Sequence, residues 1–166
     1  MRIIYDDITV VKADVIINAA NGIGFMGGLL GRFIPLRGVA ESIHYATKGK
    51  VEKEARQACR KNKWIPRYFC GHKSGEIYLT GAGSLPAKWI IHAVTMPFPG
   101  MKSNLQTIRS LLLKIIEEAK RLGAQSVSLP LLGTGTGGLS KESVLDIYRS
   151  FFDKLHDLEI IVVDKG

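Results

Sequence analysis

Several features that would assign the chain to a special class are scarce or missing. There are only two cysteines, Cys59 and Cys70, in 166 residues, too few for the disulfide framework of a small secreted protein. No apolar run approaches the roughly 20 residues that a membrane-spanning helix needs, and the first residues follow a strand-like pattern instead of a signal-peptide layout. We therefore expect a cytoplasmic protein with free thiols and no membrane contact.

Metal ligands are equally scarce. Cys59, Cys70 and His72 could supply three ligands to a tetrahedral zinc site, but the sequence has no obvious fourth ligand. We predict inert thiols instead, and neither a metal ion nor a cofactor.

What the chain does have is the composition of a globular domain. Hydrophobic residues make up 46% and charged residues 23%, close to the average for such domains. The length is that of one domain, and we find no repeat, linker or low-complexity tract. We therefore predict a single domain over residues 1–166, and a monomer.

The formal charge of +8 implies attraction to polyanions. Basic residues recur at three- and four-residue steps, which would place them on one helical face if a helix continues that far. A solvated helix face is the simpler interpretation, because no stacking aromatic residues alternate with the charges. Polyanion contact through this face stays open for four residues: Lys53, Arg56, Arg60 and Lys63.

Short apolar runs alternate with stretches of helical periodicity, which is typical of an α/β domain with a largely parallel sheet. Strands are predicted at residues 2–5, 15–19, 76–80, 89–94, 127–131 and 160–163. Helices are predicted at residues 40–48, 51–61 and 104–122, and from the capping residue Ser140 onward. Gly49 should separate the first two helices, and Gly123 stands where a helix-terminating glycine belongs. Residues 22–38 should form a long loop that could contain one helical turn, and such loops are usually functional.

Two glycine-rich segments, residues 22–28 and 133–138, directly follow predicted strands. Glycines let a backbone approach a ligand closely, and successive N–H groups favour phosphate. Each segment alone could be only a tight turn, since neither matches a Walker or a dinucleotide-binding pattern. Asn18 and Asn21 strengthen the functional interpretation. Asn18 would be costly to bury without a hydrogen bond, and Asn21 stands just beyond a strand's carboxyl end, where ligands of open α/β sheets bind.

Four segments in a fixed order carry a resemblance to a known family. They are Asp-Ile-Thr at residues 7–9, Asp-Val-Ile-Ile-Asn-Ala-Ala-Asn at 14–21, the stretch 80–94 with its Leu-Pro-Ala-Lys and Ile-His, and Ser-Leu-Pro through the glycines at 128–138. The sequence resembles the macro domains over essentially its whole length. The resemblance implies a three-layer α/β/α fold with a mixed, mostly parallel six-stranded sheet. It also implies that ADP-ribose, or an ADP-ribosylated protein, binds at the carboxyl ends of the strands.

The resemblance also implies roles for individual residues. Asp7, with the Ile8 backbone beside it, would accept a hydrogen bond from the adenine amino group, and Asn21 would bind the distal ribose. Asn18 would tie the loops together, and His92 is expected to be structural and not a catalytic base. The implied ligand contacts are Asp7, Ile8, Asn18, Ala19, Asn21, Gly27, Gly28, Gly133, Thr134, Gly135, Thr136 and Gly137.

The chain departs from the family's pattern at the position of a catalytic aspartate. Many hydrolytic members carry that aspartate in a Val-Asp-Gly sequence, where this chain has Ala40, displaced by an insertion. Glu41 is the obvious substitute, although it could simply be an acid of the first helical turn. We therefore predict Asn21 and Glu41 as the catalytic residues.

Two further departures concern the loops. A branch of the family that reads Gly-x-Met-Gly places a lysine in the first loop, but this chain has Gly28 and no lysine there. The aromatic residue that often covers the distal ribose is replaced by Gly137, so Phe25 or Phe33 would have to take its place.

Two functions consequently stay open, with a third less favoured. The chain could hydrolyse an ADP-ribosyl ester, either on a protein carboxylate or in O-acetyl-ADP-ribose, and we favour this function. It could instead be a non-catalytic reader of ADP-ribose or poly-ADP-ribose, as the missing aspartate suggests. A nucleic-acid-binding domain that uses the basic face is the least favoured of the three.

Overall fold

The computed structural model describes residues 1–27, 38–60, 64–65, 69 and 71–165. Six strands form one sheet in the order β1-β6-β5-β2-β4-β3. Their bounds are β1 Arg2–Tyr5, β2 Val15–Asn21, β3 Ile77–Gly81, β4 Trp89–Met96, β5 Ser126–Pro130 and β6 Glu159–Asp164. The pairs β1–β6, β6–β5, β5–β2 and β2–β4 are parallel, and β3 runs antiparallel to β4. The predicted mixed, mostly parallel sheet of six strands is confirmed.

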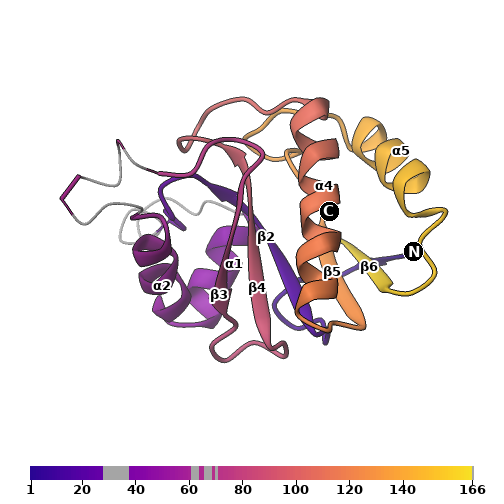
Figure 1. Ribbon diagram of the computed structural model, residues 1–166, viewed down its shortest axis with the longest axis horizontal. Coiled ribbons are helices and arrows are strands. Elements are labelled where there is room, and N and C mark those ends of the chain that lie inside the picture. The colour runs from indigo at the N-terminus through magenta and orange to yellow at the C-terminus, as the bar shows by residue number, and fades with distance from the viewer. Residues whose placement is uncertain (28–37, 61–63, 66–68, 70, 166) are drawn as a thin grey trace.

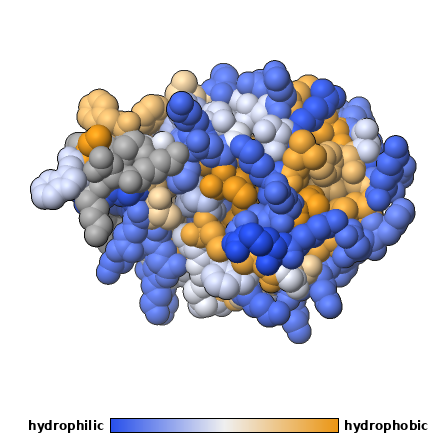
Figure 2. Space-filling model, viewed as in Figure 1, coloured by the Kyte–Doolittle hydropathy of each residue, from blue (hydrophilic) through white to orange (hydrophobic). Residues whose placement is uncertain are grey.

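Helices cover both faces of this sheet (Figure 1). Their bounds are α1 Val39–Ala46, α2 Lys50–Ala58, α4 Leu105–Arg121 and α5 Lys141–Phe152. Figure 2 shows hydrophilic side chains interspersed with apolar patches on the face that carries α4 and α5. Of the helices that the structure describes, none is long and apolar enough to cross a membrane.

Strand β2 contributes side chains to the hydrophobic cores on both faces of the sheet. Val15 and Ile17 pack into the core beneath α4 and α5, whereas Ile16 packs into the core beneath α1 and α2. All three side chains are fully buried. Because successive side chains of a strand point to opposite faces, a continuous apolar run is what a strand between two helical layers requires. The predicted three-layer architecture is confirmed.

Most predicted helix boundaries lie within two residues of the observed ones, but α2 ends at Ala58 and not at the predicted residue 61, so Arg60 lies beyond the helix. Ser140 Oγ accepts a hydrogen bond from the Ser143 N–H at 3.2 Å, so it caps α5 as expected. Gly123 follows α4 with a φ of +68°, and Gly49 separates α1 from α2 with a φ of +77°. These conformations favour glycine.

Two strands end two residues later than their sequence patterns indicate. β2 and β4 were expected to end at residues 19 and 94, but they continue to Asn21 and Met96. The two strands pair with each other along their length, and an irregularity lies between Ala20 and Asn21. Backbone hydrogen bonds between β2 and β4 therefore extend both strands beyond their apolar runs. As a result, Asn21 lies at the carboxyl edge of the sheet.

Tyr148 connects α5 to the end of β5. Its side chain is fully buried, and its hydroxyl donates a hydrogen bond to the Pro130 carbonyl at 2.7 Å and accepts one from the Leu132 N–H at 3.0 Å. Burial raises the pKa of Tyr148, so the hydroxyl stays protonated. This one group satisfies two buried backbone groups just before the second glycine segment.

We expect Tyr148→Phe to lower the free energy of unfolding by about 1–3 kcal/mol, because it leaves a buried donor and a buried acceptor unpaired. Urea denaturation followed by circular dichroism measures this change. The control is Tyr45→Phe, since Tyr45 is 53% exposed and the same chemical change should have little effect there. Equal unfolding midpoints for the two variants would show that the two hydrogen bonds of the Tyr148 hydroxyl do not stabilise the fold.

Candidate functional site

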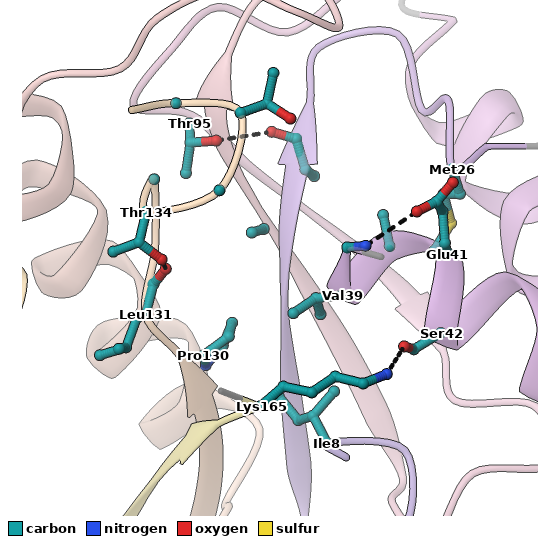
Figure 3. Close-up of a pocket in the computed structure, with 18 of the residues that line it drawn as sticks. Ile8, Met26, Val39, Glu41, Ser42, Thr95, Pro130, Leu131, Thr134 and Lys165 are labelled. Atoms are coloured by element: carbon teal, nitrogen blue, oxygen red, sulfur yellow. Dashed lines mark hydrogen bonds between the residues drawn. The ribbon is translucent and has the colours of Figure 1, made fainter. Parts of the chain in front are cut away.

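A cleft of about 520 Å³ opens at the carboxyl edge of the sheet. The ends of β2, β4, β5 and β6 contribute to its lining, together with residues 6–8, which follow β1, and the start of α1. Figure 3 shows these walls, with the glycine segment after β5 on one side and α1 on the other. Ligands of open α/β sheets bind at this edge, and the sequence predicts a ligand there.

At one end of the cleft, an ion pair joins the residues that follow the neighbouring strands β1 and β6. Asp7 Oδ1 accepts hydrogen bonds from the Thr9 N–H at 2.9 Å and the Thr9 hydroxyl at 2.7 Å. Asp7 Oδ2 accepts one from Lys165 Nζ at 2.5 Å. The same ammonium donates to Ser42 Oγ at 3.0 Å (Figure 3). Burial acts to raise the pKa of Asp7, but the hydrogen bonds from Lys165 and Thr9 and the charge of Lys165 outweigh it and lower this pKa to about 2. Asp7 is therefore a charged acceptor at neutral pH.

Apolar side chains line the cleft close to this ion pair. Ile8 is 3% exposed and Val163 is 4% exposed, and both line the cleft together with Val39 and Pro130. Such surfaces suit the faces of a flat ring, and the few polar groups beside them would fix its orientation.

The segment after β5 presents free backbone donors. Among the residues that the structure describes, the N–H groups of Gly135, Thr136 and Gly137 donate to no backbone or side-chain acceptor. A Cβ atom at Gly137 would lie 2.5 Å from the Gly133 carbonyl oxygen, so the loop closes this tightly only with glycine. Three successive free N–H groups in such a loop form an anion-binding surface.

Asn21 holds the first loop in place. Its Oδ1 accepts hydrogen bonds from the N–H groups of Ile23 at 3.2 Å and Phe25 at 3.1 Å, and its Nδ2 donates to the Phe25 carbonyl at 2.6 Å. Within the described part of the chain, the second amide N–H of Asn21 has no partner. Asn21 and Phe25 both line the cleft, so the side chain expected to bind ribose also shapes the loop beside it.

Glu41 faces the cleft from the first turn of α1. Its side chain is 6% exposed, and Oε2 accepts a hydrogen bond from the Gly38 N–H at 3.0 Å, which caps the helix. Oε1 is buried and has no hydrogen-bond partner within the described residues. A Cβ atom at Gly27 would lie 2.9 Å from Oε1, so only glycine leaves room for this oxygen. Ala40, at the position of the missing aspartate, lines the same cleft.

Asn18 and His92 lie outside the cleft. Both are fully buried. Asn18 Nδ2 is 3.0 Å from His92 Nδ1, and His92 Nε2 is 2.8 Å from Thr80 Oγ1. Burial lowers the pKa of His92 to about 3, so the ring is neutral at physiological pH. This agrees with the structural role expected for His92. Asn18 contacts His92 within the core, and its expected contact with a ligand stays a prediction.

Most of the other expected contacts come together in the cleft. Besides Asp7, Ile8 and Asn21, the lining includes Ala19, Gly27, Gly133, Thr134, Gly135, Thr136 and Gly137. Gly28 and Phe33 lie outside the described residues. Lys165 could not be predicted as a site residue, because a single lysine beyond a predicted strand carries no recognisable pattern.

The basic face is only partly described. Lys53 and Arg60 are exposed, and Lys63 lies outside the described residues. Arg56 forms a salt bridge with Glu52, and its guanidinium carbon lies 6.0 Å from the centroid of the Phe25 ring. Arg56 therefore packs against the first loop, while polyanion contact through this face stays a prediction.

Sequence comparison assigns the chain to a family. The family described as Macro domain matches residues 17–148. The chain belongs to the macro domain family. A Macro domain-containing protein of Streptomyces griseus is 34% identical to this macro domain over 138 residues, which are 83% of this chain and 70% of that protein. A protein of Aeropyrum pernix is 33% identical over 138 residues, also 83% of this chain but only 62% of its own length.

Solved structures agree with this assignment. The macrodomain of Mycobacterium tuberculosis DarG superimposes with a TM-score of 0.78 at 23% identity, over 99% of this chain and 98% of that one, and it shows the shared fold. A mutant of the Oceanobacillus iheyensis macrodomain, solved with ADPR, has a TM-score of 0.75 and 26% identity over 99% of this chain and 84% of that one.

The ion pair between Asp7 and Lys165 predicts a specific titration. The pKa of Asp7 should be about 2 and should rise toward the ordinary value of 3.8 in Lys165→Met, because the variant removes both the hydrogen bond and the positive charge. The folded-state pKa lies below the unfolded one, so the stabilisation is present above about pH 4 and is lost as the pH falls toward 2. Carboxyl-detected NMR titration measures this pKa. An unchanged Asp7 pKa in Lys165→Met, matching the exposed control Lys154→Met, would show that the pair does not form in solution.

Proposed function

We propose that this macro domain binds ADP-ribose in the cleft and hydrolyses an ester through which ADP-ribose carries an acyl group. The ester is either the one to a protein carboxylate or that of O-acetyl-ADP-ribose. Binding is supported by the related Oceanobacillus iheyensis macrodomain, which was solved with ADPR. The cleft's free donors and apolar walls support it independently.

The parts of ADP-ribose fit successive parts of the cleft. The adenine ring would lie between Ile8 and Val163, with its amino group toward Asp7. The diphosphate would lie between two groups of backbone donors, the free N–H groups at residues 135–137 and those of the first turn of α1. Helix N-termini and successive N–H groups both favour phosphate. The distal ribose would then lie beside Asn21, whose second amide N–H can donate to a ribose hydroxyl.

The observation that carries the hydrolytic proposal is Glu41 Oε1, a buried carboxylate oxygen without a partner among the described residues. Leaving such an atom unpaired is costly, so it is suited to accept a hydrogen bond from a water molecule. Glu41 would take a proton from that water as it adds to the ester carbonyl carbon. The proton would pass to the departing ribose oxygen, which leaves as a hydroxyl. The cap at Oε2 holds the side chain in one orientation for this step.

A reader of ADP-ribose is the second candidate function. Ala40 stands where many hydrolytic members, by resemblance, carry aspartate, and it offers no acid. A reader would bind in the same cleft without turnover, so the two functions differ only in whether the bound ligand is then cleaved.

The test compares Glu41→Gln with the wild type. Calorimetric titration should give ADP-ribose dissociation constants within about threefold of each other, because glutamine keeps the shape and the oxygen that caps Gly38. Release of acetate from O-acetyl-ADP-ribose, and of ADP-ribose from a protein modified on carboxylates, should fall at least about a hundredfold, the usual effect of losing a general base.

Glu142→Gln is the matched control. Glu142 is also an acid in the first turn of a helix, but it is exposed, and this variant should keep full activity. ADP-ribose binding without turnover in the wild type would make the domain a reader. Wild-type turnover that survives in Glu41→Gln would remove Glu41 from the mechanism, and absence of ADP-ribose binding would overturn the whole proposal.

A further inference from the structure

The ammonium group of Lys165 lies beside Asp7 in the lining of the cleft. Its side chain extends from the end of β6 across the cleft toward α1 (Figure 3), where Nζ meets Asp7 Oδ2 at 2.5 Å and Ser42 Oγ at 3.0 Å. The negative charge of ADP-ribose resides on its diphosphate, but Lys165 lies beside the Asp7 carboxylate, near the apolar walls suited to a base. Lys165 is therefore placed to contact the edge of the base and not the diphosphate.

The hydrogen-bonding capacity at this point can be counted. An ammonium group has three N–H donors, and Lys165 uses two of them, for Asp7 and Ser42. Asp7 Oδ1 already accepts two hydrogen bonds from Thr9, whereas Oδ2 accepts one and keeps a second lone pair. Within the described residues, Lys165 and Asp7 thus offer one donor and one acceptor side by side.

The nearby ion pair of Lys141 and Asp164 leaves the Asp7–Lys165 pair available. Lys141 and Asp164 also line this part of the cleft, and they pair with each other at 2.8 Å and 3.0 Å. A ring held between Ile8 and Val163 would therefore find its polar partners in Asp7 and Lys165.

Purines differ at the edge that would meet this pair. Adenine carries an amino donor at position 6, whereas guanine carries a carbonyl acceptor there, and lysine is a common partner of that carbonyl. A carboxylate alone would accept from the amino group and repel the carbonyl. A carboxylate with an ammonium beside it can satisfy either group, and so avoids the large penalty for an unpaired polar group at a binding site.

We propose that Lys165 broadens the base specificity of the cleft, so that it accepts a 6-oxopurine diphosphate ribose as well as ADP-ribose. Asp7 Oδ2 accepts from the amino group of adenine, and Lys165 Nζ donates to the carbonyl of the 6-oxopurine. This inference rests on the proposed binding of ADP-ribose in the same cleft, but not on its hydrolysis.

The test uses two ligands that differ only at position 6 and the adjoining ring proton, ADP-ribose and inosine diphosphate ribose. Calorimetric titration of the wild type should give dissociation constants within about tenfold of each other. In Lys165→Met, inosine diphosphate ribose should weaken at least about tenfold relative to ADP-ribose, the usual cost of losing a specific base contact. Lys165→Arg keeps a cationic donor and should keep the wild-type ratio.

Lys154→Met is the control, because Lys154 is exposed and does not line the cleft. Its ratio of the two constants should equal that of the wild type. The ratio is insensitive to a uniform loss of binding, and thermal unfolding of each variant confirms that it is folded.

Two results would overturn the role of Lys165 and leave ADP-ribose binding intact. One is a wild type that binds ADP-ribose but discriminates at least about a hundredfold against inosine diphosphate ribose. The other is a ratio that does not change in Lys165→Met. A wild type that binds neither ligand would instead refute the proposed function itself, and this inference with it.

Discussion

The parallel alignment of β1, β6, β5, β2 and β4 is the constraint on which the rest of the structure depends. Parallel strands end at the same edge of a sheet, and the chain must leave each strand there to return through a helix. Every loop that comes after one of these strands therefore begins at one edge. The cleft, its glycine segment and its polar side chains all lie at that edge because of this alignment.

Three side chains of the cleft have a structural role as well as a proposed functional one. Asn21 closes the loop at residues 22–25, Glu41 caps α1, and Asp7 holds Thr9 and Lys165. In each case part of the side chain's hydrogen-bonding capacity orients it, and another part stays available. A side chain fixed in this way can meet a ligand without being reordered on binding, which is how pre-organised sites limit the cost of association.

Much of the fold could be predicted because its signals are local. Apolar runs predicted the strands, and Ser140 and Gly123 predicted helix ends. The resemblance to the macro domains implied the three-layer arrangement. β2 and β4 end two residues beyond their predicted ends, because their pairing with each other, and not their composition, decides where they stop. The lining of the cleft was predictable where the chain keeps a motif of the family in the family's order, as for Asp7, Asn21 and residues 133–137. The single-domain assignment of residues 1–166 stays a prediction.

The sequence by itself determined the architecture, the edge of the sheet at which a ligand would bind, and the glycine segments that line it. These depend on periodicity, on helix-capping chemistry and on the steric freedom of glycine, which act over a few residues. Only the tertiary structure showed that Asn18 lies against His92. It also showed that Glu41 has one oxygen bonded to Gly38 and the other without a partner among the described residues. It also brought Lys165 to Asp7, 158 positions away in the sequence. Contacts at such separation depend on how the layers pack and how the strands order themselves, and no local pattern of residues encodes that arrangement.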